Sequence, residues 1–212
     1  MHINKWAYHF FSFSSIFSSG ADLETMHKLS KTSSRSEIDH FIFDKLSRGL
    51  TAPFHCSKPV ACSLDGHTIA GGLMIALACD YISIGTRKPF RIGITGPIVG
   101  IPYPLKALKL AQHQLQPQLA YRLLVDAQLF SSIDFPIRCE RGKQPDELAH
   151  KWLTMITDRP LNGFQITKRK WWSDLIALDE MADEIERKDY FQAVTSKACV
   201  QAMEKALNKD KQ

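Results

Sequence analysis

The stretch from Lys58 to Asp80 contains the residue types that most clearly suggest chemistry. Its apolar run Val60–Leu64 predicts a buried strand, and the apolar residues from Leu73 to Cys79 predict a helix. Between them, Ala70-Gly71-Gly72 lets one backbone segment approach another closely. A strand that passes through such a turn into a helix gathers unpaired N–H groups, which suits an anion or an oxygen that becomes anionic during a reaction. A close-packed turn between two buried elements would show the same pattern.

A second small-residue loop, Ile16-Phe17-Ser18-Ser19-Gly20-Ala21-Asp22-Leu23, lies upstream and is followed at once by a helical pattern. The two loops, in this order and spacing, resemble those of the enoyl-CoA hydratase/isomerase (crotonase) superfamily. In that family each loop gives one backbone N–H to an oxyanion hole, which holds the thioester oxygen of an acyl-CoA. The resemblance implies that Ala21 is the first donor and Gly71 the second.

The resemblance also implies a set of residues around the acyl-CoA substrate: Ser19, Gly20, Asp22, Leu23, His67, Ala70, Gly72, Tyr103 and Lys168. Some of these residues have a second interpretation. Asp22 is a typical helix cap, and His67 would lie near the cleft entrance or act as a structural hydrogen-bonding residue. Tyr103 would line the acyl pocket or simply pack. Lys168, beside Arg169 and Lys170, would bind the CoA phosphates or belong to a solvated helix face.

Proton transfer next to a thioester also needs a positioned acid or base. In the hydratases of this family a glutamate follows the oxyanion glycine by three residues, and this sequence has Met74 there. In Δ3,Δ2-enoyl-CoA isomerases the glutamate lies in a segment that aligns with Ile92–Gly96, so Gly96 takes its position. The sequence resembles these isomerases most, which implies isomerase-like action on fatty acyl-CoA in β-oxidation. The alternative is a catalytically inactive protein that binds acyl-CoA or pairs with other subunits.

The elements that must position these loops begin as strands and continue as helices, which favours an α/β domain. Further strands are predicted at Trp6–Phe13 and Tyr81–Gly85. The polar, Ser/Thr-rich stretch Ser30–Ser36 predicts a mobile loop, and Phe130–Arg141 is irregular in pattern.

The resemblance implies a crotonase-like spiral of ββα units with a C-terminal helical segment that forms a homotrimer or hexamer. Because family members have further strands before the first loop, it also implies that the first strands are missing here. We divide the chain into a truncated spiral core, residues 1–145, and a C-terminal helical segment, residues 146–212.

Composition limits the classes of function. A chain of 212 residues fits one domain with a sizeable core. Its net charge of +5 would suit a polyanionic ligand such as CoA, and no nucleic-acid recognition motif accompanies it. No apolar run reaches the length of a membrane span. The 5 cysteines show no metal-ligand spacing, so we expect free thiols in a reducing intracellular compartment, the cytoplasm or the mitochondrial matrix. We expect no metal, and no cofactor besides the coenzyme A of the substrate.

Overall fold

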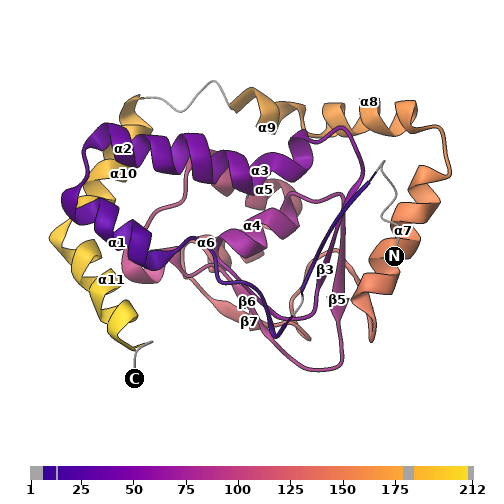
Figure 1. Cartoon of the computed structure of the whole chain (residues 1–212), viewed down its shortest axis with the longest axis horizontal. Helices are drawn as coiled ribbons and strands as arrows, with labels where there is room; N and C mark the ends of the chain where they lie inside the picture. Colours follow the sequence, from indigo (N-terminus) through magenta and orange to yellow (C-terminus); the bar gives the residue numbers. More distant parts are fainter. Residues whose placement is uncertain (1–6, 13, 179–183, 210–212) are drawn as a thin grey trace.

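The first six described strands of the chain belong alternately to two sheets (Figure 1). The computed structural model describes residues 7–12, 14–178 and 184–209. Sheet A is parallel and contains, in spatial order, β1 (Tyr8–Phe11), β3 (Val60–Leu64), β5 (Tyr81–Gly85) and β8 (Glu140–Gly142). Sheet B contains, in spatial order, β2 (Ile16–Ser18), β4 (His67–Ile69), β6 (Arg91–Gly93) and β7 (Leu129–Ser131), and its pair β6–β7 is antiparallel. Because β1, β3 and β5 are each followed by a strand of sheet B, the chain winds as the predicted spiral.

Helices connect the strand pairs and continue to the C-terminal end. Those before β7 are α1 (Leu23–Thr32), α2 (Arg35–Asp39), the π-helix η1 (His40–Ser47), α3 (Arg48–His55), α4 (Gly71–Leu77), the 3₁₀ helix η2 (Gly96–Val99), α5 (Leu105–Gln114) and α6 (Pro117–Leu124). Those after β8 are α7 (Pro145–Thr157), α8 (Leu161–Trp171), α9 (Ser173–Ala177), α10 (Glu184–Thr195) and α11 (Lys197–Lys209).

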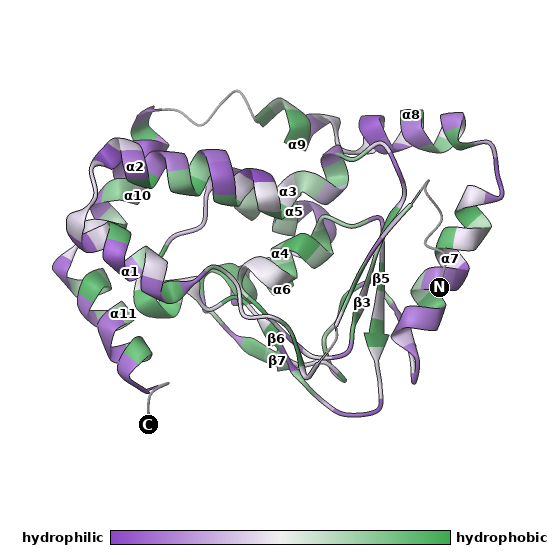
Figure 2. Cartoon of the chain, viewed as in Figure 1, coloured by the Kyte–Doolittle hydropathy of each residue, from purple (hydrophilic) through white to green (hydrophobic). Residues whose placement is uncertain are grey.

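The short helix α4 lies in the interior of the fold (Figure 1), and every residue of it except Ile75 is buried. Leu73 and Leu77 belong to the main hydrophobic cluster together with Leu64 of β3. Figure 2 shows this interior mostly in green, whereas α8 at the outside carries much purple. Burying one such leucine stabilises the fold by about 1.5–3 kcal/mol. This packing fixes the first turn of α4, and therefore Gly71, relative to the sheets.

The helices after residue 145 pack directly on the earlier part of the chain. Ala149 and Leu153 of α7 share a cluster with Ala7, which precedes β1, and with Ala61 of β3. At the other end of the molecule α10 and α11 lie beside α1 and α2 (Figure 1), through a second cluster that contains Met26, Ile38, Tyr190, Val194 and Met203. The predicted boundary at residue 145 falls at the start of α7. The division of the chain into two parts there stays a prediction.

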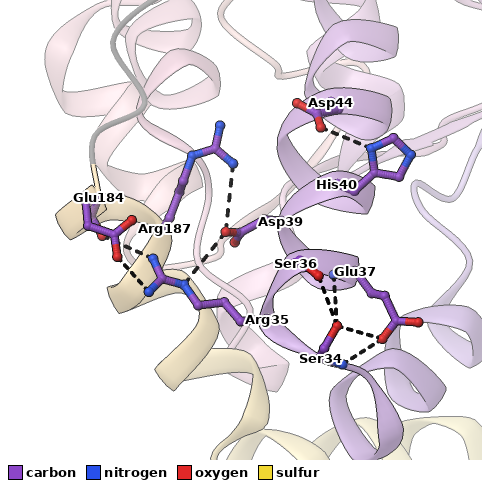
Figure 3. A network of polar contacts seen from close by, with 9 residues as sticks. All are labelled: Ser34, Arg35, Ser36, Glu37, Asp39, His40, Asp44, Glu184 and Arg187. Atoms are coloured by element: carbon purple, nitrogen blue, oxygen red, sulfur yellow. Dashed lines mark hydrogen bonds and ion pairs between the residues drawn. The ribbon is translucent and has the colours of Figure 1, made fainter.

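Polar contacts reinforce the junction between α2 and α10 (Figure 3). Arg35 Nη1 lies 2.7 Å from a carboxylate oxygen of Glu184, and Arg35 Nε lies 3.7 Å from Asp39. Arg187 approaches the same Asp39 at 3.9 Å. Burial raises the pKa of the Asp39 carboxyl, and the two guanidinium groups counteract that rise. Asp39 thus links α2 to α10, and Tyr190 of α10 lines the cavity described below.

Two local predictions are wrong. Ser30–Ser36 is not a mobile loop, because α1 continues to Thr32 and α2 begins at Arg35. Ser30 is buried and its hydroxyl donates to the Met26 carbonyl, while Ser34 forms a complete capping box with Glu37. Phe130–Arg141 is not wholly irregular either, since it overlaps the short strands β7 and β8. Local side-chain hydrogen bonds and sheet pairing account for these differences.

The strands β1 and β2 are the edge strands of sheets A and B. In these strands, Tyr8, Phe10 and Ile16 are between 41% and 52% exposed. The predicted absence of earlier strands stays a prediction. Among the described residues, no helix combines the length and apolar character that crossing a membrane requires.

Candidate active site

The two predicted loops lie in contact. β2 and β4 are parallel neighbours, so the segments that follow their carboxyl ends leave sheet B at the same edge. A Cβ atom added to Gly20 would lie only 3.2 Å from the Gly71 nitrogen and 2.7 Å from Ala70 Cβ. A Cβ atom added to Gly71 would lie 3.9 Å from the Ala21 nitrogen. The backbones of Ala21 and Gly71 therefore meet at one place.

The amide groups at this meeting point are unusually available. Gly71 is the first residue of α4, so its N–H has no acceptor within the helix. Within residues 7–12, 14–178 and 184–209, neither the Ala21 nor the Gly71 N–H donates a hydrogen bond to another residue. The neighbouring amide of Ala70, in contrast, donates to the Gly93 carbonyl at 2.8 Å. Two unpaired donors side by side can bind one oxygen atom.

Ala70, which precedes α4, holds an unfavourable backbone conformation, with φ of 52° and ψ of −119°. Positive φ favours glycine, and a residue held in such a region costs about 1–3 kcal/mol. The bond from Ala70 N–H to Gly93 and the contact with Gly20 maintain this conformation. Because this turn aims the Gly71 amide, strain is stored next to the candidate site.

Ala70→Gly should raise the free energy of unfolding by up to about 1 kcal/mol, since relief of positive-φ strain outweighs the added chain entropy of glycine. Urea denaturation measures this change. Ala52→Gly is the control: Ala52 lies exposed within α3, where glycine costs about 1 kcal/mol. A similar loss of stability in both variants would show that Ala70 is not strained.

An apolar cavity of about 320 Å³ opens at the two amides. This volume suits a small ligand or part of an acyl chain. Of the residues predicted to form the site, seven line it: Ser19, Ala21, Leu23, Ala70, Gly71, Gly96 and Tyr103. The cavity also has lining residues that sequence reasoning missed, from the helices around it: Met26, Ile42, Leu46, Leu50, Ala107, Leu110, Tyr190 and Ala206. Ile42 and Leu46 fall on one face of an amphipathic pattern, a signal for burial rather than for a ligand.

Three of the predicted residues do not line the cavity and instead shape the loops beside it. Gly20, at φ of 96°, allows the close approach to Ala70 described above. Gly72 faces Ser18, because a Cβ added to it would lie 2.6 Å from Ser18 Cβ. The Asp22 carboxylate caps α1 by accepting from the Thr25 amide at 2.9 Å, and its bonds with Thr25 lower its pKa. Asp22 therefore acts on the helix and not on the cavity.

The other two predicted residues lie elsewhere. His67, expected near the cleft entrance, lies in β4, where its Nδ1 accepts a hydrogen bond from the Arg91 amide at 3.0 Å. The structural interpretation of His67 therefore agrees with the structure, and the ligand interpretation does not. Neither the His67 nor the Lys168 side chain lines the cavity.

Lys168 requires a clear correction. Its side chain is buried, and its ammonium group donates to the Pro53 and Lys58 carbonyls at 3.0 Å and to Asp80 at 2.6 Å. All three donors of the ammonium group are thereby used within the protein. The prediction that Lys168 binds CoA phosphates is wrong for this structure, and so is its alternative, the solvated helix face.

The cavity contains no ionisable side chain of the usual acid/base type. Its described lining includes no Asp, Glu, His, Lys, Arg or Cys. The family resemblance implies a glutamate at the position of Met74 or of Gly96, and both of these residues line the cavity. In the part of the chain that the structure describes, no group of three or more His, Cys, Asp or Glu residues is arranged to hold a metal ion. The polar groups of the cavity are amides and hydroxyls.

Tyr103 fills the space in front of Gly96. A Cβ atom added to Gly96 would lie 2.9 Å from Tyr103 Cε2 and 3.0 Å from the Ile101 carbonyl. Burial raises the pKa of the Tyr103 phenol well above its usual range, and a hydrogen bond from the Gly96 backbone has the opposite, smaller effect. Tyr103 therefore stays a neutral phenol near neutral pH, at the point where a side chain of residue 96 would begin.

Comparison with known proteins gives the same picture. A family model described as enoyl-CoA hydratase/isomerase matches residues 11–135. Three similar solved structures are the human mitochondrial delta3-delta2-enoyl-CoA isomerase (TM-score 0.83, 17% identity, 96% of this chain and 79% of that one), an enoyl-CoA hydratase/isomerase from Mycobacterium paratuberculosis (0.78, 14%, 94% and 79%) and the enoyl-CoA hydratase from Bacillus halodurans (0.77, 19%, 94% and 81%). At these identities the likeness establishes the fold, and the predicted crotonase-like fold is confirmed. No curated protein matches the chain.

Proposed function

The chain belongs to the enoyl-CoA hydratase/isomerase family, and we propose that it binds a fatty acyl-CoA with the thioester oxygen between the amides of Ala21 and Gly71. The proposal is supported by two N–H groups that have no acceptor among the described residues and belong to neighbouring residues lining one apolar cavity. Two such donors stabilise the negative charge that develops on a thioester oxygen when the neighbouring carbon loses a proton. The apolar wall of the cavity suits the acyl chain.

We place the reaction in the class of proton transfer next to a thioester, as in Δ3,Δ2-enoyl-CoA isomerisation during fatty-acid β-oxidation. The substrate would supply the coenzyme A, so no further cofactor is needed. We also propose a homotrimer or hexamer assembled through the C-terminal helices, as the family resemblance implies.

Titration calorimetry with hexanoyl-CoA tests the binding proposal directly. A matched thioether analogue, which lacks the carbonyl oxygen, should bind more weakly because it leaves both amides without a partner. Equal affinity for the two compounds would mean that the amides do not bind the thioester oxygen. Conversion of 3-hexenoyl-CoA to conjugated 2-hexenoyl-CoA, followed by absorbance, tests the isomerase reaction itself.

One observation favours a second candidate, an inactive protein that binds acyl-CoA or pairs with other subunits. No carboxylate lines the cavity within the described residues, and removing a positioned acid or base typically costs about 10²–10⁴-fold in rate. An active isomerase would need another group to carry the proton.

Restoring a carboxylate separates the two candidates. Gly96→Glu alone should destabilise the fold by about 1–3 kcal/mol, since the new side chain meets Tyr103 and Ile101. The double variant Gly96→Glu/Tyr103→Ala removes the first of these contacts and should isomerise 3-hexenoyl-CoA about 10²-fold faster than the natural protein.

Gly96→Gln/Tyr103→Ala is the matched control, with nearly the same shape and no acid/base group. If the isomerisation rate rises in Gly96→Glu/Tyr103→Ala but not in Gly96→Gln/Tyr103→Ala, the result supports the inactive alternative for the natural chain. An equally fast natural protein would exclude that alternative, because the chain would then already have a working acid or base.

A further inference from the structure

A second cluster of polar side chains lies outside the cavity, between sheet A and α7. It contains His9 of β1, Ser63 of β3 and Asp146 in the first turn of α7. Side chains two positions apart on a strand point to the same face of a sheet. Ala7 and Ala61, two positions before His9 and Ser63, belong to the cluster that packs against α7. His9 and Ser63 therefore face α7 from two neighbouring strands.

The hydrogen bonds of this cluster assign the proton of His9. The His9 Nε2 atom lies 2.8 Å from the fully buried Ser63 hydroxyl, which donates to the Asp146 carboxylate. An ionised carboxylate can only accept, and a hydroxyl has a single hydrogen to donate. Ser63 must therefore accept from His9, so Nε2 carries the hydrogen of the neutral ring. Within the described part of the chain Nδ1 has no hydrogen bond, and a second proton would add there.

A positive charge on His9 is unfavourable in this place. The side chain of His9 is only 13% exposed, and burial lowers the pKa of its imidazole. The Asp146 carboxylate, 4.0 Å from Nε2, raises the pKa and His150 of α7 lowers it, but both effects are smaller than that of burial. Asp146 is itself 57% exposed, so water screens its attraction. On the β3 side, His9 faces Ala61 and Ser63, which carry no charge.

We propose that His9, Ser63 and Asp146 form a pH-sensitive latch, which holds the edge strand β1 against α7 while His9 is neutral and lets β1 open when His9 gains a proton. The strand β1 is suited to such a device, because within the described residues it pairs with β3 alone, whereas β3 and β5 each pair on both sides. Elements at an edge open locally at a lower cost in free energy than central ones. The latch lies outside the cavity and does not need a ligand there.

The direction of the response follows from proton binding. In the open state His9 reaches water and has the ordinary pKa of 6.5, whereas in the closed state its pKa is lower. Between these two values the open state binds more protons, so a fall in pH favours opening. The opening equilibrium constant of β1 should rise as the pH falls below 6.5 and level off below the closed-state pKa. The total rise is about tenfold for each unit by which the closed state lowers the pKa.

Two measurements on the full chain test this latch. NMR titration of the His9 imidazole, followed by its Cε1–H signal, should give a midpoint below 6.5. Amide hydrogen exchange, corrected for the intrinsic pH dependence of exchange, gives the opening equilibrium constants. The amide of Tyr8, which donates to the Pro59 carbonyl at 3.0 Å, reports on β1, and the amide of Ile84 reports on the central strand β5. Opening at Tyr8 should rise in acid by the factor that the NMR midpoint predicts, and opening at Ile84 should rise less.

Three variants identify the group that titrates. His9→Gln keeps an N–H for Ser63 but cannot gain a proton, so the acid response of β1 should disappear. Asp146→Asn keeps an acceptor for Ser63 and removes the negative charge, so the His9 midpoint should fall further. His150→Gln is the matched control: it removes another imidazole of the same region and should move the His9 midpoint up towards 6.5.

Several results would overturn the latch. They are a His9 midpoint at or above 6.5 in the natural protein, opening of β1 that does not change with pH, and an acid response that persists in His9→Gln. An equal rise in opening at Ile84 would also overturn it, in favour of acid unfolding of the whole chain. If His9→Gln does not fold, the agreement between midpoint and opening in the natural protein, together with the shift in Asp146→Asn, decides.

Discussion

Lys168→Met should lower the free energy of unfolding by about 3–5 kcal/mol, because removing one partner of a buried ion pair leaves the other charge uncompensated. The Lys168 and Asp80 side chains are only 4% and 9% exposed, and Lys168 Nζ lies 2.6 Å from Asp80 Oδ2. The same ammonium group binds the Pro53 and Lys58 carbonyls, so three acceptors lose their donor together. Urea denaturation at neutral pH measures the loss.

The matched control is Lys170→Met, two residues away on the same helix, which removes an exposed lysine and should change stability by less than about 0.5 kcal/mol. Lys168→Met/Asp80→Asn should recover part of the loss, since it removes the uncompensated charge and keeps an oxygen for the Val60 amide. If Lys168→Met weakened acyl-CoA binding without loss of stability, Lys168 would be the phosphate ligand after all.

The deficit of Lys168→Met should also depend on pH. Burial raises the pKa of the Asp80 carboxyl, and the Lys168 ammonium group counteracts this effect. Without Lys168 the folded-state pKa rises further above the unfolded-state value. Between these two values the folded state binds more protons, so stability increases as the pH falls. The difference in free energy of unfolding between the natural protein and Lys168→Met should therefore shrink as the pH falls through the folded-state pKa that Asp80 has in the variant. A constant difference would contradict a buried, unpaired carboxylate.

Lys168 also shows what local sequence cannot reveal. A run of Lys168, Arg169 and Lys170 is typical of a solvated helix face or an anion site. Its partner Asp80 lies 88 positions earlier in the sequence, at the end of the turn after α4. Only the packing of α8 against that turn brings the two charges together. Tyr103 in front of Gly96 is a similar case, because an irregular segment joins them and its path depends on tertiary packing.

Other parts were predictable because local and global signals agree. The run Val60–Leu64, apolar except for Ser63, and the strand Tyr81–Gly85 occupy the middle of parallel sheet A, where both faces are covered. The two small-residue loops follow β2 and β4, which pair in sheet B. The pairing brings the two loops together, and their small residues allow the backbones to approach closely. In Ser30–Ser36 the signals conflict, since Ser/Thr composition favours a loop while Ser34 and Glu37 form a capping box.

Gly71→Pro should reduce turnover of an acyl-CoA substrate by about 10²–10³-fold, the typical cost of losing one oxyanion-hole donor. The substitution removes the N–H and puts the proline ring Cδ in its place, so the oxygen loses a donor and meets a methylene group there. Proline suits the first position of a helix, which is the place that Gly71 holds in α4. The one close contact of a new Cβ atom is with Leu50 Cδ2 at 3.0 Å, and that methyl group is the end of a flexible side chain.

Gly71→Ala is the control that makes this result specific, because it adds the same Cβ atom and keeps the N–H. A second measurement does not depend on turnover: the ¹³C chemical shift of the carbonyl in bound [1-¹³C]hexanoyl-CoA reports how strongly hydrogen bonds polarise it. We expect this chemical shift to change when the ligand binds to the natural protein or to Gly71→Ala. In Gly71→Pro the change on binding should be markedly smaller. If Gly71→Pro retains both the shift and the turnover of Gly71→Ala, the Gly71 amide does not bind the thioester oxygen.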